Sequence, residues 1–281
     1  YDMAMFRKTF GRIPAAVWDT QTAARLLGFE QFGLANLIEA EYGVTLSKAS
    51  QKADWGRRPL TEKMLSYAFN DVRYIVPMAR SFVHRLEECG RMSWFIESCD
   101  SAREYAANRE ERPSEEAWRV NGWGSLDRLG MAYLKALWYW RDDECRRLDR
   151  PAFKLISNSE LISISLRLQR GERVDPPHYL RPPIARRLIK TIKDARNIPE
   201  SEWPRRLRGH GGPRLQIDEG ELQRLREHRN TQAHRLGIDP TLIAPRAVME
   251  KLAATNVDDA EKDKLLLQWQ RSLMGRDGAG E

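Results

Sequence analysis

Apolar residues recur at intervals of three and four along most of the chain, which predicts a protein built mainly from α-helices. The pattern is clearest between residues 61 and 79, where one helical face would be buried by Met64, Ala68, Val72, Ile75 and Ala79. Further helices are predicted at 2–10, 20–27, 32–41 and 92–108. Residues 15–18 alone are predicted to form a short strand.

Capping and breaking residues mark the predicted helix boundaries. Asp19 and Thr61 can each accept a backbone N–H group at a helix start. Pro77 cannot lie in an undisturbed helix interior, so a kink or a new helix is expected near it. Ser157 and Glu160 have the spacing of a capping box, which predicts another helix start.

The second half of the chain contains a repeat. Residues 141–161 align with residues 229–249, and in each copy a helix ends near a Leu, a turn with Pro follows and a second helix starts. Two copies of one small helical module are the simplest explanation.

Tyr67 and Asp71 lie four residues apart in the 61–79 helix, so a phenol and a carboxylate stand one turn apart on one face. The carboxylate could hold a hard divalent cation, and the phenol could orient a water bound to that cation. The same pair fits a half-buried tyrosine beside a solvated aspartate, which is the more common arrangement. The surrounding sequence favours the first interpretation.

The helix and its approach read Asp-Trp at 54–55, Arg-Pro-Leu at 58–60 and Tyr-Ala-Phe-Asn-Asp at 67–71. This series resembles the third exonuclease motif of ribonuclease D, in the tyrosine branch of the DEDD family of 3'-to-5' exonucleases. The opening YDMAMFRKTFG resembles the second motif and its following helix. The resemblance implies that Tyr67 orients the attacking water and that Asp71 and Asp2 bind metal.

The resemblance further implies two divalent cations, Mg²⁺ or Mn²⁺, held by Asp2, Asp71 and two acids of a first motif, Asp-x-Glu. In the family that motif precedes the second, and no such motif precedes Asp2 in this sequence. We therefore expect a fragment with little or no catalysis by itself, because two carboxylates cannot hold two neighbouring cations against their repulsion.

The later segments resemble the helicase and ribonuclease D C-terminal (HRDC) module, an all-α bundle. The expected fold is therefore mainly α: the C-terminal part of an α/β ribonuclease H-like exonuclease domain, followed by helical bundles. The expected boundaries are 1–108 for the exonuclease part, 109–125 for a linker, 126–205 for the first HRDC module and 216–274 for a second HRDC-like module.

Composition narrows the class of protein. Charged residues make up 31% and hydrophobic residues 41%, as in ordinary soluble proteins, and no apolar run approaches the roughly 20 residues that cross a bilayer. Three cysteines without CxxC spacing favour reduced thiols in the cytoplasm. The net charge of +7 favours a polyanionic partner, whether RNA, DNA or an acidic protein surface.

Candidate nucleic-acid contacts lie in two places. Arg57 and Arg58 precede the Tyr67 helix and could meet phosphates near the cleaved bond, although Arg58 equally suits a structural ion pair. Arg186, Arg187 and Lys190 lie on the helix that closes the first module, where they could follow a phosphate backbone. A solvated helix face explains this second cluster equally well.

The resulting prediction is a cytoplasmic 3'-5' exoribonuclease of the ribonuclease D type that trims structured RNA such as tRNA precursors. The alternative is a noncatalytic nucleic-acid-binding protein that keeps the HRDC modules. A DNA exonuclease of the proofreading kind is a third interpretation. The sequence indicates neither the natural RNA nor the oligomeric state.

Overall fold

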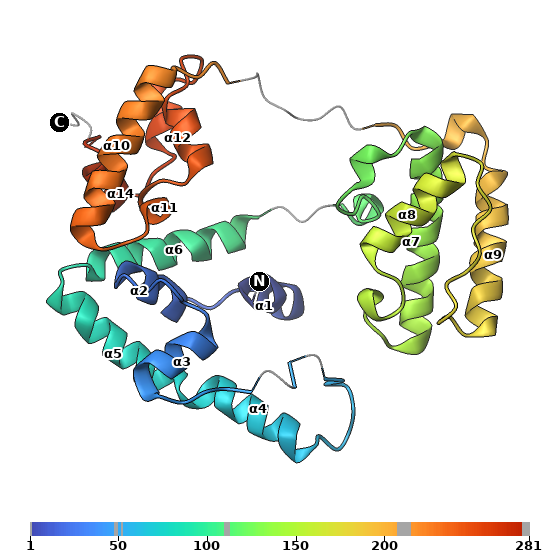
Figure 1. Cartoon of the computed structure of the whole chain (residues 1–281), viewed down its shortest axis with the longest axis horizontal. Helices are drawn as coiled ribbons and strands as arrows, with labels where there is room; N and C mark the ends of the chain where they lie inside the picture. The colour runs from blue at the N-terminus through green and yellow to red at the C-terminus, as the bar shows by residue number, and fades with distance from the viewer. Residues whose placement is uncertain (1, 48–49, 52, 110–112, 207–214, 277–281) are drawn as a thin grey trace. The chain divides into compact units, whose positions relative to one another are not determined.

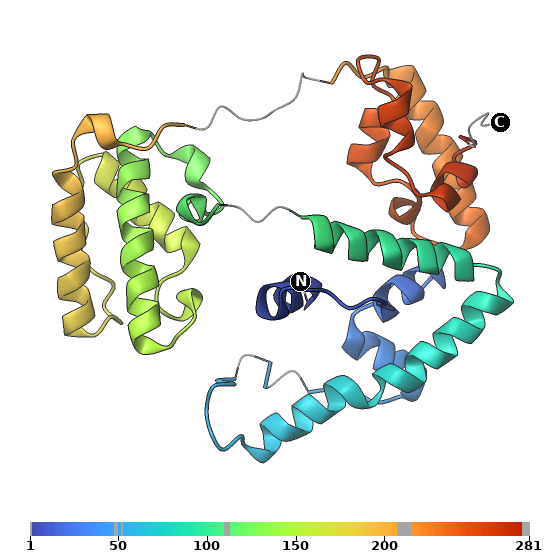
Figure 2. The same cartoon turned by 180° about the vertical axis from the view of Figure 1, so that it is seen from behind.

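The computed structural model describes residues 2–47, 50–51, 53–109, 113–206 and 215–276, which form helices joined by turns and loops (Figures 1 and 2). They belong to two compact units, one made of Tyr1–Arg109 with Pro213–Glu281 and the other of Glu110–Gly212. The β-type pairing in the described parts is a single bridge between Ile217 and Ala254. The predicted strand at 15–18 is wrong, because no neighbouring strand is present there to share its hydrogen bonds.

The first unit combines an N-terminal and a C-terminal segment. The N-terminal helices are α1 (Asp2–Phe10), α2 (Thr20–Leu26), α3 (Leu34–Tyr42), α4 (Glu62–Arg73), α5 (Ile75–Glu88) and α6 (Met92–Asn108). The C-terminal helices are α10 (Glu219–Leu236), α11 (Pro240–Ile243), α12 (Arg246–Leu252), α13 (Asp259–Asp263) and α14 (Gln268–Leu273). Among these helices and those of the second unit, none is both long and apolar enough to reach across a bilayer.

Side chains at the helix starts act as the sequence predicts. Asp19 accepts from the N–H of Gln21 at 2.9 Å and begins α2, and Thr61 accepts from the N–H of Met64 at 3.3 Å and begins α4. Pro77 lies in the first turn of α5, after the chain breaks from α4 at Tyr74. The prediction of a new helix near Pro77 is confirmed.

The inner face of α4 is narrower than predicted. Met64 is buried and Ala68, Ile75 and Ala79 are half-buried, but Val72 is 60% exposed. The prediction of a buried Val72 is wrong, because the described neighbours of α4 cover the side of the helix that carries Met64. The opposite side leaves Phe69 68% exposed.

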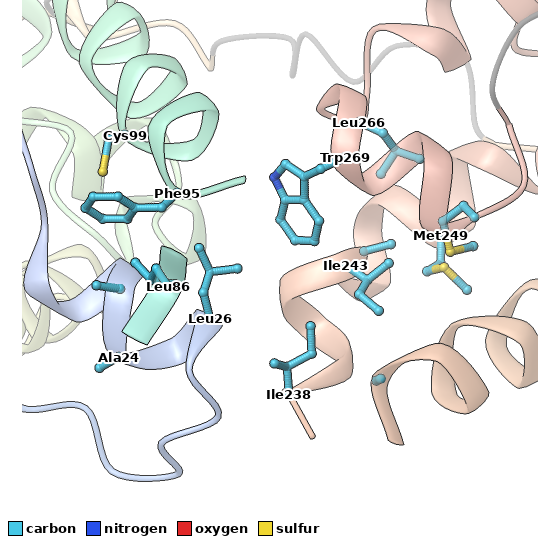
Figure 3. Close-up of a cluster of buried hydrophobic side chains, with 14 of the residues drawn as sticks. Ala24, Leu26, Leu86, Phe95, Cys99, Ile238, Ile243, Met249, Leu266 and Trp269 are labelled. Carbon is cyan, nitrogen blue, oxygen red and sulfur yellow. The ribbon is translucent and has the colours of Figure 1, made fainter. Parts of the chain in front are cut away.

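The C-terminal segment packs onto α2 and α6 in one apolar cluster, in which Leu26, Phe95, Ile243 and Trp269 are all buried (Figure 3). The indole rings of Trp94 and Trp269 stack with their centroids 5.1 Å apart. The residues predicted as a separate module at 216–274 therefore share a core with the N-terminal helices.

Polar side chains of α6 close the ends of the helices that meet it. Arg91 at its start donates to the carbonyl oxygens of Leu26 and Leu236, at 2.6 and 2.7 Å, where α2 and α10 end. Glu97 accepts the N–H groups of Gln268 and Trp269, at 2.6 and 3.2 Å, where α14 begins. These backbone groups lack partners inside their own helices, so α6 satisfies them across the contact.

The second unit is a helical bundle with its own core. It contains η1 (Ser114–Glu116), η2 (Trp123–Ser125), α7 (Arg128–Leu148), η3 (Ala152–Lys154), α8 (Asn158–Gln169), α9 (Pro182–Arg196) and η4 (Glu200–Glu202). Trp118 and Val120, in the predicted linker at 109–125, are buried in this core. The linker prediction thus fails for Trp118 and Val120, because their apolar side chains are buried in the bundle.

A buried arginine joins the entry and exit of this bundle. The guanidinium of Arg119 lies over the rings of Trp118 and Trp123, pairs with Glu116 and donates to the carbonyl oxygen of Arg205 at 3.0 Å. Aromatic faces and a carboxylate together offset the cost of burying the cation.

The two copies of the predicted repeat share an equivalent hydrogen bond. Arg141 donates to the carbonyl oxygen of Ile156 at 3.0 Å, and its counterpart Arg229 donates to that of Ala244 at 2.8 Å. In both copies desolvation by burial lowers the pKa of the guanidinium. Both first helices end on a left-handed residue, Asp149 at φ 48° and Gly237 at φ 62°.

A glycine pair tests the packing of the C-terminal segment. A Cβ at Gly28 would lie 2.3 Å from the carbonyl oxygen of Gly237, whereas a Cβ at Gly43 would meet nothing within 4 Å. Both residues have positive φ, so each substitution by Ala carries the left-handed cost of about 1–2 kcal/mol. We expect Gly28→Ala to lower the free energy of unfolding by about 1–3 kcal/mol more than Gly43→Ala, because of the added clash. Equal losses in urea titrations would contradict the contact.

Candidate exonuclease site

Tyr67 and Asp71 lie one turn apart on α4 and open into the same two cavities. The larger cavity, about 450 Å³, is lined by both residues together with Lys63, Ser66 and Asn70. The second, about 360 Å³, lies toward the start of α3 and again includes Tyr67 and Asp71. Both side chains are half-buried, so they remain accessible from these cavities.

The carboxylate of Asp71 acts on the phenol of Tyr67. Desolvation raises the pKa of Tyr67 above its usual value, and the negative charge of Asp71 and hydrogen bonding to it raise the pKa further. Tyr67 therefore stays protonated at neutral pH and can act as a hydrogen-bond donor. A protonated phenol beside a carboxylate can donate to a water that lies in the same cavity.

The loop before α4 places the ring of Trp55 against Tyr67. The ring of Trp55 lies 5.9 Å from that of Tyr67, measured between centroids. Arg58 donates to the carbonyl oxygens of Trp55 and Arg57, at 2.9 and 2.8 Å, and so fixes the turn that presents Trp55. The ion pair considered for Arg58 in the sequence is thus replaced by bonds to carbonyl groups, while Arg57 remains exposed on the same turn.

Asp2 is the first residue of α1, and the lining of neither cavity includes it. Helix α1 is held against the end of α6 by Arg7, which donates to the carbonyl oxygens of Ala106 and Arg109 at 3.2 and 2.8 Å. No side chain of α1 is buried. In the described chain Asp2 and Asp71 are thus not joined, and the shared site expected for them remains a prediction.

The donor chemistry at Asp71 suits a hard divalent cation, since a carboxylate is the ligand type that Mg²⁺ and Mn²⁺ prefer. Within the described ranges, however, no three His, Cys, Asp or Glu side chains gather into a possible metal site. Asp71 fits such a cation as one ligand, and further ligands are required.

The three cations predicted on the last helix of the first module differ in what they contact. Arg187 forms two bonds to the carboxylate of Glu144, one of them 2.7 Å long, and the Glu144 side chain is only 2% exposed. This makes Arg187 a structural ion-pair donor within the bundle. Arg186 and Lys190 are exposed on α9, and no ion pair is present for either among the described residues.

Comparison with known proteins places these residues in a family. A family model described as 3'-5' exonuclease matches residues 1–87, which include Asp2, Tyr67 and Asp71. Ribonuclease D of Gluconacetobacter diazotrophicus is 28% identical over 98% of this chain and 70% of its own length. Ribonuclease D of Pseudomonas paraeruginosa is 29% identical over 98% of this chain and 74% of its own length. Over nearly its whole length the chain is therefore similar to ribonuclease D.

Solved structures agree with this assignment at the level of the fold. A protein from Bifidobacterium adolescentis superposes with a TM-score of 0.71 at 26% identity, over 95% of this chain and 73% of that one. Escherichia coli RNase D superposes with a TM-score of 0.55 at 22% identity, over 98% of this chain and 77% of that one. The ribonuclease D family consists of metal-dependent 3'-5' exoribonucleases, so the sequence-based prediction of activity and substrate class is confirmed.

Sequence reasoning missed the polar residues that line the candidate site. Lys63 lies one turn before Tyr67 on α4, and Asn70 lies one turn after it. Ser66 directly precedes Tyr67. Their spacing of three and four residues repeats that of Tyr67 and Asp71, and this signal places all of them on adjoining faces of α4. Trp55 was noted as part of the motif but not as the ring that packs on Tyr67.

The effect of Asp71 on the pKa of Tyr67 predicts a pH-dependent signal. Asp71→Asn removes the charge and weakens the acceptor, so it should lower the pKa of Tyr67 toward 10, while the contribution of desolvation remains. Ultraviolet titration near pH 10, with Tyr67→Phe as the reference for subtraction, measures this shift. An unchanged pKa would mean that Tyr67 and Asp71 do not interact.

The buried carboxylate distinguishes Arg187 from Arg186. Arg187→Ala leaves Glu144 buried beside Arg147 alone, 3.4 Å away, and should clearly lower the free energy of unfolding. Arg186→Ala removes an exposed cation of the same type on the same helix and should leave stability nearly unchanged. Thermal unfolding of both variants provides the comparison; equal stability would reject the structural role of Arg187.

Proposed function

We propose that this protein removes nucleotides from the 3' ends of structured RNA, such as tRNA precursors, by two-metal hydrolysis at the α4 site. The observation that carries the proposal is that Tyr67 and Asp71, one turn apart on α4, line the same cavity, where the carboxylate also raises the pKa of the phenol. The pair lies inside the segment that matches the 3'-5' exonuclease model.

Each residue has a defined role in this proposal. Asp71 and Asp2 would hold divalent cations, Mg²⁺ or Mn²⁺, together with further acids. When bound, such cations activate water and stabilise the leaving oxygen. Tyr67, kept protonated by its surroundings, would hold the attacking water in line, and Trp55 would keep the phenol in place.

The cavity and the nearby turn supply candidates for holding the RNA. Ser66 and Asn70 can hydrogen-bond a ribose or a base, and Lys63 and Arg57 can meet the phosphates. Arg58 uses one guanidinium nitrogen for both bonds to the loop, so its other nitrogens remain candidates for a phosphate contact. Arg186 and Lys190 would contact phosphates in another part of the RNA.

The organisation proposed for the chain follows the family. Residues 1–108 would be the C-terminal part of a ribonuclease H-like exonuclease domain, and 126–205 an HRDC-type bundle that extends back to Trp118. Residues 216–274 would be a second HRDC-type module, whose helices share a core with those of 1–108. The three free cysteines are compatible with the cytoplasm as the proposed location.

Asparagine in place of Asp71 gives a test in the full-length gene product. Asp71→Asn should lower Mg²⁺-dependent 3'-end trimming of a tRNA precursor by about 100-fold or more, and Tyr67→Phe by about 10- to 100-fold. The control is Asp143→Asn, the same change at an exposed carboxylate of α7, which should leave trimming unchanged. Release of mononucleotides from 3'-labelled and 5'-labelled RNA measures both rate and polarity.

Two results would contradict the proposal. Full activity of Asp71→Asn would exclude this aspartate as a metal ligand. Binding of RNA without trimming by the unmodified protein, at any Mg²⁺ or Mn²⁺ concentration, would favour the noncatalytic alternative, and faster digestion of single-stranded DNA would favour the DNA exonuclease.

A further inference from the structure

A cavity of about 550 Å³ lies in the second unit, and none of the residues to which the family gives a role lines it. Its walls are the end of α8, the loop 171–176 and the last two turns of α9. The volume is that of an ordinary small-ligand site. All of its walls belong to the same compact unit.

The loop wall is held by hydrogen bonds. Arg167 on α8 pairs with Glu172 at 3.1 Å and donates to the carbonyl oxygen of Arg173 at 3.0 Å. Gly171 turns the chain at φ 76°, a conformation that other residues rarely adopt. The cavity is therefore formed before any ligand arrives, which lowers the cost of binding.

The floor of the cavity is apolar and partly open. Leu168 and Ile192 belong to the core of the bundle, Val174 packs against it, and Ile189 remains 38% exposed at the opening. A flat hydrophobic or aromatic group could contact this floor without a change in the helices around it.

The rim is cationic. Lys193 and Arg196 lie in the last turn of α9, both exposed, and the described residues provide neither with an ion pair. The carboxylates of the rim are already paired, Glu172 with Arg167 and Asp175 with Arg173 at 3.6 Å. Net positive charge therefore faces the opening.

We propose that this cavity binds one nucleotide of single-stranded RNA, with its base on the floor at Ile189 and its phosphate between Lys193 and Arg196. The inference rests on the proposed function, since an exoribonuclease must hold the strand that it shortens. An acidic peptide would satisfy the cations but would leave the apolar floor uncovered. A nucleotide satisfies both.

Helix α9 carries further cations in line with Lys193. Lys190 and Arg186 precede Lys193 at intervals of three and four residues, so the cations follow one another in steps of about 5 Å along one side of the helix. Further phosphates of the same strand would meet these residues. Arg187 takes no part, because it is bonded to Glu144.

Binding of labelled RNA in EDTA tests the cavity without cleavage. The probes are a fluorescein-labelled uridine 12-mer, an abasic 12-mer with the same backbone and a glutamate 12-mer, measured by anisotropy on the full chain over a range of salt. Lys193→Glu with Arg196→Glu should weaken binding of the uridine 12-mer about tenfold or more. Loss of two phosphate contacts should reduce the slope of log K against log salt by about 1.4.

Two further variants separate the cavity from general electrostatics. Ile189→Ser should remove the preference for the uridine over the abasic probe and keep the salt slope. Lys135→Glu with Lys154→Glu reverses two exposed charges outside the cavity on the same unit and should change affinity less than threefold.

Three results would overturn the inference: equal weakening by both charge reversals, an unchanged salt slope in the cavity variant, or glutamate 12-mer binding that the cavity variant abolishes to the same extent. If Asp71→Asn stops trimming while the cavity variant binds RNA normally, this inference alone fails. If Asp71→Asn trims normally, the proposed function fails and the binding data judge the cavity independently.

Discussion

Arginine side chains that donate to backbone carbonyl groups hold this helical chain together. Every helix ends in carbonyl groups without a partner of its own, and a chain of many short helices has many such ends. Arg91 closes the ends of α2 and α10 at once, and Arg119 and Arg206 tie the start of the second unit to the segment that leaves it. A planar guanidinium with five N–H donors can reach two carbonyl groups and still lie on an aromatic ring, which a lysine cannot do equally well. Packing of apolar faces supplies the driving force for folding, and these bonds determine which helix ends lie next to one another.

The same bonds change the meaning of the positive charge. The net charge of +7 favours a polyanionic partner, yet many of the arginines behind it face carbonyl groups or carboxylates inside the fold. Arg187 is the clearest case, since the sequence places it beside Arg186 and Lys190 and the structure gives it to Glu144. On α9, Arg186, Lys190, Lys193 and Arg196 are exposed, have no ion pair among the described residues and follow one another at intervals of three and four residues. Exposure and pairing, rather than the number of basic residues, therefore locate the surface that can meet RNA.

Local features of the fold could be predicted from sequence, and contacts between distant residues could not. Caps at Asp19 and Thr61, the break near Pro77 and the Tyr67–Asp71 pair all depend on residues a turn apart, where helix geometry leaves little freedom. The burial of Val72 and the linker at 109–125 were predicted wrongly because both depend on which other segment lies against them. The site divides in the same way: one turn of α4 brings together Tyr67 and Asp71, while the position of Asp2 depends on how α1 is anchored by Arg7 about a hundred residues away in sequence.

The repeat shows how one module can serve two purposes. Arg141 and Arg229 make the same bond at the same offset, so the hairpin of each copy is closed by the same interaction. What differs is the last helix. In the second copy α14 turns Trp269 onto Trp94 and gives its first N–H groups to Glu97, so its face is used within the protein. In the first copy α9 buries Ile184, Leu188 and Ile192 and leaves its cations in solvent. Because the shared hydrogen bond does not involve the last helix, the outer face of that helix can differ between the copies, and the cationic copy is the one whose outer face is left for a ligand.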